Sequence, residues 1–341
     1  MQAAARCNIH ARRPGRHRHE FCAAVGLCLS GAPTLNPADN PETPNHKRLV
    51  PGPDVSADEA AGIDDDESPV VLSEKEKETA QEQTEPSAPV VFEIVRREGE
   101  RELRRPGHSL WFSGVAAGLA IGFSVFAQAL LREALPDTDW TIIIEKFGYC
   151  VGFILIINAR LQLFTENTIT AVVPVILKPN RRTFLRTAQL WAVVLSANVL
   201  GAALFAVFAS YGAVSDDALY QAMLEISRHA VGFAPVELIA RGTMAGFLIA
   251  MLVWIMASME SDKTLMIILI TYLVALGDFA HVIAGSVEAV LLVISGDVAP
   301  WDAFSRFFMP TLLGNVIGGS LIFTMLVYAQ IHREIKHGES Q

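Results

Sequence analysis

The sequence predicts an all-α polytopic membrane protein with six transmembrane helices, arranged as two inverted three-helix repeats in which helices 2 and 5 are broken. Four long stretches carry no charged residue, two further apolar segments are interrupted near their middle, and small-residue and asparagine motifs recur in both halves. The 341 residues are 51% hydrophobic on average. This is close to the globular range of about 45–50%, so the prediction depends on the clustering of apolar residues.

Each charge-free stretch is long enough to cross a bilayer. The hydrocarbon layer is about 30 Å thick, and a helix of about 18 or more apolar residues spans it. A surface helix of a soluble protein would instead show polar residues with a period of about 3.6. The four stretches are 109–131, 187–214, 242–259 and 307–331.

Two more apolar segments are interrupted by polar residues. The first covers 147–159, breaks at 160–167 and resumes at 168–177, and the second covers 264–277, breaks at Asp278 and resumes at 279–287. Each half is shorter than a bilayer crossing, whereas each pair has the length of one. Broken helices are tolerated in membranes only where the freed backbone faces protein or water, and in transporters they mark the substrate site.

The two halves of the apolar region share motifs. Segment 114–121 aligns with 242–249, and segment 198–204 aligns with 315–321, which places Asn198 and Asn315 at matching positions. A broken segment lies between these markers in each half, so the order helix, broken helix, helix occurs twice. Because three crossings leave the chain on the opposite side, the second repeat is inverted relative to the first.

The positive charges of the loops predict the orientation. With both termini in the cytoplasm, nine Lys and Arg residues lie on the cytoplasmic side and four on the outer side, as the positive-inside rule requires. The nine are Arg104, Arg105, Lys178, Arg181, Arg182, Arg186, Lys263, Arg333 and Lys336. The four are Arg132, Lys146, Arg228 and Arg306.

Residues 1–106 are predicted to form a disordered, acidic cytoplasmic tail. Within it, 54–102 carry 16 acidic and 5 basic residues and too little apolar area for a core, although Val90–Arg105 is expected to form a short amphipathic helix. A six-helix transmembrane domain follows at 107–335, and a short cytoplasmic tail at 336–341. The sequence shows no basic patch typical of nucleic-acid binding and no metal-ligand spacing among its four cysteines.

His281 is the main candidate for function. It lies three residues after the break in the second broken helix, and an ionisable group at that depth is a functional candidate because its charge is costly there. Its ordinary pKa near neutrality suits proton exchange with a weak acid. Half-helix N-termini after Thr165 and after Asp278 are expected to converge near it and to favour an anion. The alternative is a neutral histidine that is hydrogen-bonded within the bundle.

The residues around the breaks have structural alternatives. Asp278 is predicted to be the N-cap of the half-helix that follows it. Thr165 either caps the other half-helix or turns its hydroxyl towards the path. Arg160 and Glu166 flank the first break and are expected to pair across it as structural support.

Other polar and apolar side chains near the breaks are also assigned. Leu163 and Phe164 form either an apolar constriction, which we favour, or ordinary packing. Glu237 and Glu288 are expected to be structural or interfacial.

With these motifs the sequence resembles the formate/nitrite transporter family. The resemblance rests on Leu163-Phe164-Thr165 in a broken second helix, His281 in a broken fifth helix and the two Asn-Val-x-Gly motifs. It covers about 108–335, and the runs 163–170 and 275–288 are closest to the YfdC-like branch. It implies an aquaporin-like six-helix protomer with its own pore, a homopentamer, and location in a bacterial inner membrane.

The resemblance also implies roles for pore residues. Leu163, Phe164 and Thr165 would form the cytoplasmic constriction with a gating threonine, and His281 would be the central histidine. Tyr149 would belong to the outer constriction, together with Val274 where a second phenylalanine is usual.

The sequence departs from the family pattern at three positions. Ala230 stands where members carry a lysine in the outer vestibule, with Arg228 and His229 as the nearest cations. Gly246 stands where an asparagine is usual, and Ala280 where an acid precedes the histidine, with Asp278 displaced by two positions.

These residues predict a channel or transporter for a small monovalent anion, with proton coupling through His281 and no cofactor. One alternative is an aquaporin-like channel for neutral solutes, although such channels carry Asn-Pro-Ala where this chain has 165–167 and 278–280. The other is a non-transporting scaffold or sensor whose acidic tail recruits a partner. An intramembrane aspartyl protease is disfavoured because it needs two aspartates, and only Asp278 lies in an apolar segment.

Overall fold

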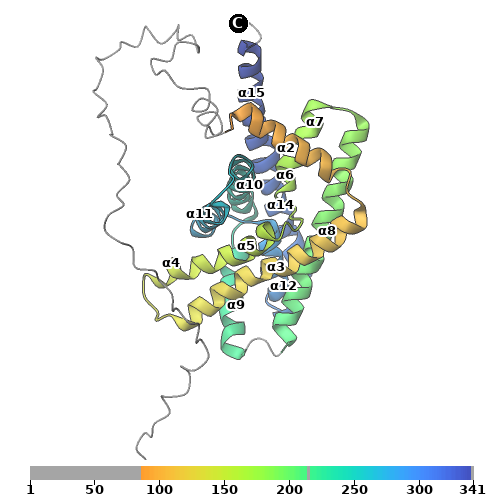
Figure 1. The fold of residues 1–341 in the computed structure, drawn as a ribbon. Helices are drawn as coiled ribbons and strands as arrows, with labels where there is room; N and C mark the ends of the chain where they lie inside the picture. Colours follow the sequence, from red (N-terminus) through yellow and green to blue (C-terminus); the bar gives the residue numbers. More distant parts are fainter. Residues whose placement is uncertain (1–85, 213–215, 339–341) are drawn as a thin grey trace, which may run out of the picture. The chain divides into compact units, whose positions relative to one another are not determined.

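The computed structural model describes residues 86–212 and 216–338, with side chains described up to residue 332, and these parts contain helices and no strands (Figure 1). Five helical stretches are long and apolar enough to cross a membrane, with mean hydropathy from 1.6 to 2.2. They are α3 (Gly107–Ala134), Thr141–Asn158, α8 (Arg181–Tyr211), α10 (Pro235–Ser258) and Pro300–His332. The predicted all-α membrane fold is therefore confirmed.

Two of these stretches combine several helical elements. Thr141–Asn158 contains α4 (Thr141–Glu145), η1 (Lys146–Tyr149) and α5 (Cys150–Asn158). Pro300–His332 contains α13 (Pro300–Asp302), η2 (Ala303–Phe308), α14 (Met309–Val316), η3 (Ile317–Phe323) and most of α15 (Thr324–Gly338). The first of them corrects the expectation that each half of a broken segment is too short to cross. Its helix begins at Thr141, before the apolar run, and reaches 18 residues.

Shorter helices follow the two breaks. After α5, the chain is non-helical until α6 (Asn167–Thr170) and α7 (Val173–Leu177). Between α11 (Lys263–Leu276) and α12 (Val282–Ser295), the residues 277–281 are non-helical. Arg160 (φ 54°) and Asp278 (φ 48°) adopt the left-handed conformation at the start of each break. A left-handed residue turns the chain out of the preceding helix, and side chains other than glycine seldom adopt it.

Asn198 of α8 holds the first break together. Its side-chain oxygen accepts from the Phe164 backbone N–H at 2.8 Å, and its Nδ2 donates to the carbonyls of Gly114 and Gln162, both at 2.8 Å. Asn198 is fully buried. One side chain thereby supplies hydrogen bonds that the missing helical turn leaves unmade, which an interior without water requires.

Asn315 of α14 does the same at the second break. Its oxygen accepts from the Val282 backbone N–H at 2.9 Å, and its Nδ2 donates to the carbonyls of Gly242 and Ala280 at 2.9 and 2.8 Å. The two asparagines therefore match in every hydrogen bond as well as in sequence. This correspondence supports the internal repeat.

Glycines allow the helices that carry these asparagines to approach closely. A Cβ on Gly118 would lie 2.1 Å from the Asn198 carbonyl oxygen, and one on Gly246 would lie 2.2 Å from that of Asn315. Small residues are typical of such helix contacts in membranes. Gly246 is thus required here for the approach of α10 to α14.

Two further helices lie near the ends of the bundle. The amphipathic α9 (Asp217–Val231), which the sequence analysis did not assign, is capped by Asp216 and packs on α3 and α12. At the other end of the bundle, α2 (Ala88–Glu102) packs on α6, α7, α10 and α15 (Figure 1). Because α2 is a packed helix, the part of 1–106 from residue 88 onward belongs to the folded domain, whereas residues 1–85 lie outside the described residues.

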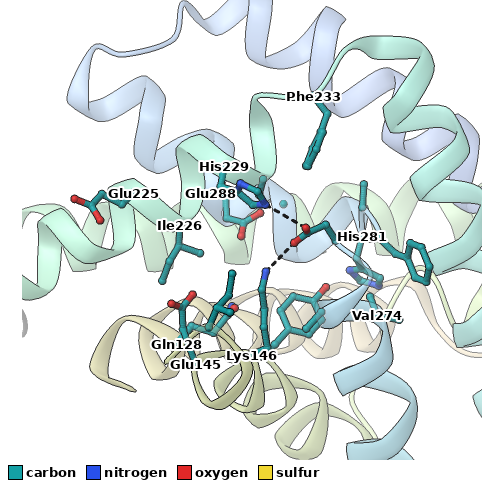
Figure 2. A pocket seen from close by; sticks show the side chains of 18 of the residues that line it. Gln128, Glu145, Lys146, Glu225, Ile226, His229, Phe233, Val274, His281 and Glu288 are labelled. Atoms are coloured by element: carbon teal, nitrogen blue, oxygen red, sulfur yellow. Dashed lines mark hydrogen bonds and ion pairs between the residues drawn. The ribbon is translucent and has the colours of Figure 1, made fainter. Parts of the chain in front are cut away.

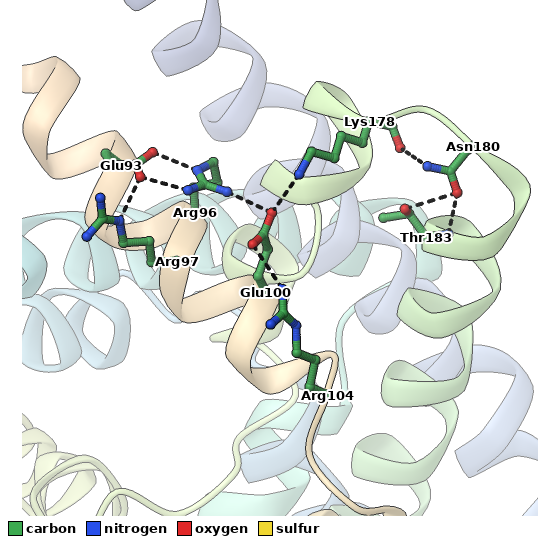
Figure 3. A network of polar contacts seen from close by, with 8 residues as sticks. All are labelled: Glu93, Arg96, Arg97, Glu100, Arg104, Lys178, Asn180 and Thr183. Atoms are coloured by element: carbon green, nitrogen blue, oxygen red, sulfur yellow. Dashed lines mark hydrogen bonds and ion pairs between the residues drawn. The ribbon is translucent and has the colours of Figure 1, made fainter.

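Apolar contacts and ion pairs attach α2 to its neighbours. Phe92 and Val95 are buried in a cluster with residues of α6, α7, α10, η3 and α15. Arg96 bridges Glu93 and Glu100, at 2.6 and 2.7 Å, and Lys178 after α7 reaches Glu100 at 3.2 Å (Figure 3). Hydrogen bonds from Arg96 and Arg97 lower the pKa of Glu93 to about 2, and the hydrogen bond from Lys178 lowers the pKa of Glu100.

Acid is expected to loosen α2. Glu100 joins α2 to Lys178, and the hydrogen bond from Lys178 lowers its pKa from the ordinary value of 4.5. Its carboxylate therefore stabilises the attachment of α2 above pH 4.5, and this contribution is lost as the pH falls through the lowered pKa. A spin label at Val90→Cys, an exposed position of α2, reports the attachment after the other cysteines are replaced. We expect an immobile line shape at pH 6 and a mobile one near pH 2, with Lys178→Gln moving the transition to higher pH. The same line shape at both pH values would contradict this assignment.

Candidate functional site

The two breaks meet at a buried pair of side chains. Thr165 Oγ1 lies 2.7 Å from His281 Nε2, and the two residues are 0% and 3% exposed. His281 Nδ1 accepts from the Ala284 backbone N–H at 3.3 Å, which makes His281 the N-cap of α12. Because Nδ1 accepts, the neutral ring carries its proton on Nε2 and donates it to Thr165. The Thr165 hydroxyl therefore keeps its own proton for another acceptor.

A cavity of about 260 Å³, here the α9-side cavity, reaches His281 of this pair (Figure 2). It is bounded by α3, η1, α9, α11 and α12. The predicted pore residues that line it are His281, Tyr149 and Val274. Tyr149 packs its ring 5.2 Å from that of Phe153, which in turn lies 5.1 Å from the His281 ring in an edge-on contact.

A second cavity of about 870 Å³, here the α2-side cavity, approaches the pair from the other end of the bundle. Residues of α2, α5, α10 and the first break line it, among them Leu163 and Phe153. The α9-side cavity is lined by His281 and the α2-side cavity by Phe153 and Leu163. Because Phe153 and Thr165 both contact His281, the barrier between the cavities consists of these four buried side chains. This barrier is short and mainly apolar.

Phe164 lines neither of these cavities. Its ring is 1% exposed and packs edge-on against Trp191 at 5.6 Å. Its backbone N–H is bonded to Asn198, which turns the side chain towards α8. The expected constriction therefore contains Leu163, with Phe153 in the place where Phe164 was expected.

The predicted pairing of Arg160 with Glu166 does not occur. Both residues line the α2-side cavity, but Arg160 is exposed and Glu166 Oε1 is buried without a hydrogen-bond partner. The left-handed backbone at Arg160 directs the chain away from the helix axis, so adjacency in sequence does not bring the two charges together.

The predicted N-cap role of Asp278 is also wrong. Helix α12 begins at Val282, three residues later than a cap at Asp278 would require, and His281 is its cap. Asp278 instead lies 2.8 Å from Lys146 Nζ and 3.2 Å from His229 Nε2 (Figure 2). Arg241 of α10 donates to the carbonyls of Gly277 and Asp278 at 3.4 and 3.2 Å, which satisfies this break from a further side.

Lys146 and Glu288 are the cavity residues whose place the sequence analysis missed. Lys146 was treated as a loop cation, yet it lies in η1 and is the cation of the α9-side cavity that reaches the second break. Glu288 was assigned a structural or interfacial role, yet it lines this cavity. The sequence did contain a signal for both residues, because each is an ionisable residue next to an apolar run. Glu237 does have a structural role, because its carboxylate accepts from the Ala234 backbone N–H.

The arrangement suits an anion. One cavity reaches His281 and the other reaches Phe153 and Leu163. The Thr165 hydroxyl, which can donate a hydrogen bond, is bonded to the His281 imidazole, which can supply a proton. Among the described residues, no group of three or more His, Cys, Asp or Glu side chains is placed to hold a metal ion.

Comparisons with known proteins agree with this geometry. A family model described as "Formate/nitrite transporter" matches residues 89–329. The chain is 37% identical to "Inner membrane protein YfdC" of Escherichia coli (strain K12) over 276 residues, covering 80% of this chain and 89% of that protein. It is 25% identical to a "Formate-nitrite transporter" of Plasmodium malariae, over 63% of this chain and 69% of that protein.

Solved structures show the same fold. A "Pentameric formate channel with formate bound" superposes with a TM-score of 0.57 at 20% identity, covering 66% of this chain and 97% of that one. An "FNT family ion channel" superposes with a TM-score of 0.59 at 18% identity, covering 70% and 98%.

Proposed function

Because the chain belongs to the formate/nitrite transporter family, we propose that it moves small monovalent anions of weak acids, such as formate or nitrite, through one pore in each protomer of a homopentamer. Membership makes it a multi-pass membrane channel or transporter and not an enzyme. The observation that carries the substrate class is the buried Thr165–His281 pair between the two cavities. The pentameric solved relative supports the assembly.

The barrier favours a neutral species at the moment of crossing. Moving an ion into an apolar region without full hydrogen bonding costs many kcal/mol, whereas a neutral carboxylic acid crosses at a far smaller cost. An anion that reaches Thr165 receives a hydrogen bond from its hydroxyl. The anion therefore needs a proton to pass Phe153 and Leu163.

His281 can supply that proton through Thr165. A proton that binds Nδ1 replaces the hydrogen bond from Ala284 and gives an imidazolium. The Nε2 proton then moves to Thr165 Oγ1 as the hydroxyl proton moves to the anion, which leaves a neutral imidazole and a neutral acid. On the far side the acid ionises and releases the proton, so one anion and one proton cross together.

The orientation and location follow from the charges and the relatives. We place the protein in a bacterial inner membrane with both termini and α2 on the cytoplasmic side. The nine-to-four distribution of Lys and Arg supports this orientation, and the Escherichia coli relative supports the membrane. The α9-side cavity then faces outwards.

Uptake of radiolabelled formate into proteoliposomes, compared with osmotic swelling of the same vesicles, tests the proposed function. We expect protein-dependent formate uptake that rises as the pH falls, with no matching increase in water or glycerol permeability. Swelling without uptake would favour an aquaporin-like channel. Neither signal from folded protein, with formate, nitrite and acetate all tried, would favour a non-transporting scaffold.

A further inference from the structure

A buried carboxyl group faces the α9-side cavity without a partner. Glu288 of α12 lines this cavity and is 6% exposed (Figure 2). No hydrogen bond or ion pair to its carboxylate is made by any of the described residues. Nearly all other charged side chains that line this cavity are paired. The Glu288 carboxyl can therefore interact with a ligand that enters the cavity.

The neighbouring charges are already engaged. Lys146 makes its ion pair with Asp278, as does His229, and Arg132 is shared between Glu145 and Glu225. These groups come from α3, α4, η1, α9 and the second break, which surround Glu288.

The inner end of the cavity adds two titratable groups, Tyr149 of η1 and His281. Helices α8, η2 and α14 also pack on α12 but place no charged side chain among the residues that line this cavity. Glu288 is therefore the unpaired acid on the way from the α9-side mouth to His281.

In a path for anions, the protonation state of such a carboxyl controls whether an anion is bound or repelled. When ionised, Glu288 repels an anion across a short distance in a medium of low dielectric constant. When protonated, it has an O–H that can donate a hydrogen bond to the same anion. The two states therefore have opposite effects on occupancy of the cavity.

We propose that protonation of Glu288 gates anion entry from the α9 side. The inference rests on the proposed function and adds a regulatory and selective residue to it. The ligand class is a small carboxylate or other oxyanion that accepts a hydrogen bond from the protonated carboxyl. The transported proton and the gating proton are distinct, because the Thr165 hydroxyl is hydrogen-bonded to His281 and not to Glu288.

The test compares Glu288→Gln with wild type in proteoliposomes that have the same pH inside and outside. Glutamine is isosteric and cannot ionise, so it mimics the protonated state. Initial rates of radiolabelled formate uptake are measured from pH 5 to pH 9 and expressed as the ratio of variant to wild type, which cancels the titration of formate itself. We expect a ratio near 1 at pH 5 that rises to about tenfold at pH 9.

Two more variants provide controls. Glu288→Asp keeps a titratable group and should keep the wild-type dependence on pH. Glu133→Gln removes an exposed acid of α3 outside the cavity and should give a ratio near 1 throughout.

The possible outcomes test gating by Glu288 separately from the proposed anion transport. A ratio that stays flat from pH 5 to pH 9 while the wild type transports would overturn the gate and leave the proposed function standing. A folded Glu288→Gln variant that transports at no pH would also overturn it. No uptake by wild type at any pH would overturn the proposed function itself.

Discussion

Replacing His281 by alanine is expected to reduce formate uptake by about a hundredfold or more at pH 5–7. The variant removes the group that, in the proposed mechanism, hands a proton to the anion through Thr165, 2.7 Å away. A positioned acid contributes about 10²- to 10⁴-fold to proton transfer. The measurement is the initial rate of radiolabelled formate uptake into proteoliposomes that contain equal amounts of folded protein.

Two variants separate proton transfer from packing. Thr165→Ser keeps the hydroxyl and should retain most of the uptake, whereas Thr165→Val keeps the shape and should lose uptake to a similar degree as His281→Ala. His229→Ala removes a half-exposed histidine of the same cavity and serves as the matched control for histidine loss, with a small effect expected. Unchanged, pH-dependent uptake of every anion tried by His281→Ala would refute the role of the imidazole.

Replacing Asn315 by alanine is expected to destabilise the fold by about 3 kcal/mol or more. The change leaves the Val282 backbone N–H and the Ala280 carbonyl without their partners in the interior, and it removes the bond that ties this break to the Gly242 carbonyl of α10. Each buried polar group left unpaired costs about 1–3 kcal/mol. The apparent melting temperature in detergent should fall by about 6–12 °C, measured as the loss of the folded peak on size-exclusion chromatography.

The internal repeat supplies a second version of this experiment. Asn198→Ala removes the same three types of hydrogen bond at the first break and should have a similar effect. Asn158→Ala, at an exposed position at the end of α5, is the control and should leave the melting temperature near that of wild type. A change of 1 kcal/mol shifts the melting temperature by about 2–4 °C. If replacing either buried asparagine lowers the melting temperature by only about 1–2 °C, their hydrogen bonds do not hold the breaks together.

Some of the candidate site could be predicted from local sequence and some could not. His281 and Thr165 were identifiable because Thr165 lies within a polar interruption of an apolar run and His281 lies three residues after another, and that pattern is readable along the chain. The partner of Asp278 was not identifiable, since Lys146 lies 132 positions earlier and belongs to another helix. Only the packing of η1 against the second break brings the two charges together.

The sequence by itself determined that this is a membrane protein with two related halves. The length of the apolar runs and the repeated motifs can be read along the chain and do not depend on its tertiary structure. The tertiary structure decided where each side chain near the breaks points. The backbone is left-handed at Arg160 and at Asp278, where the two breaks begin. At the second break, helix α12 starts with His281 as its cap and places Glu288 in a cavity. At the first break, the hydrogen bond to Asn198 turns Phe164 towards Trp191. Those outcomes depend on dihedral angles and on contacts between distant helices, neither of which is encoded in the spacing of residues along one segment.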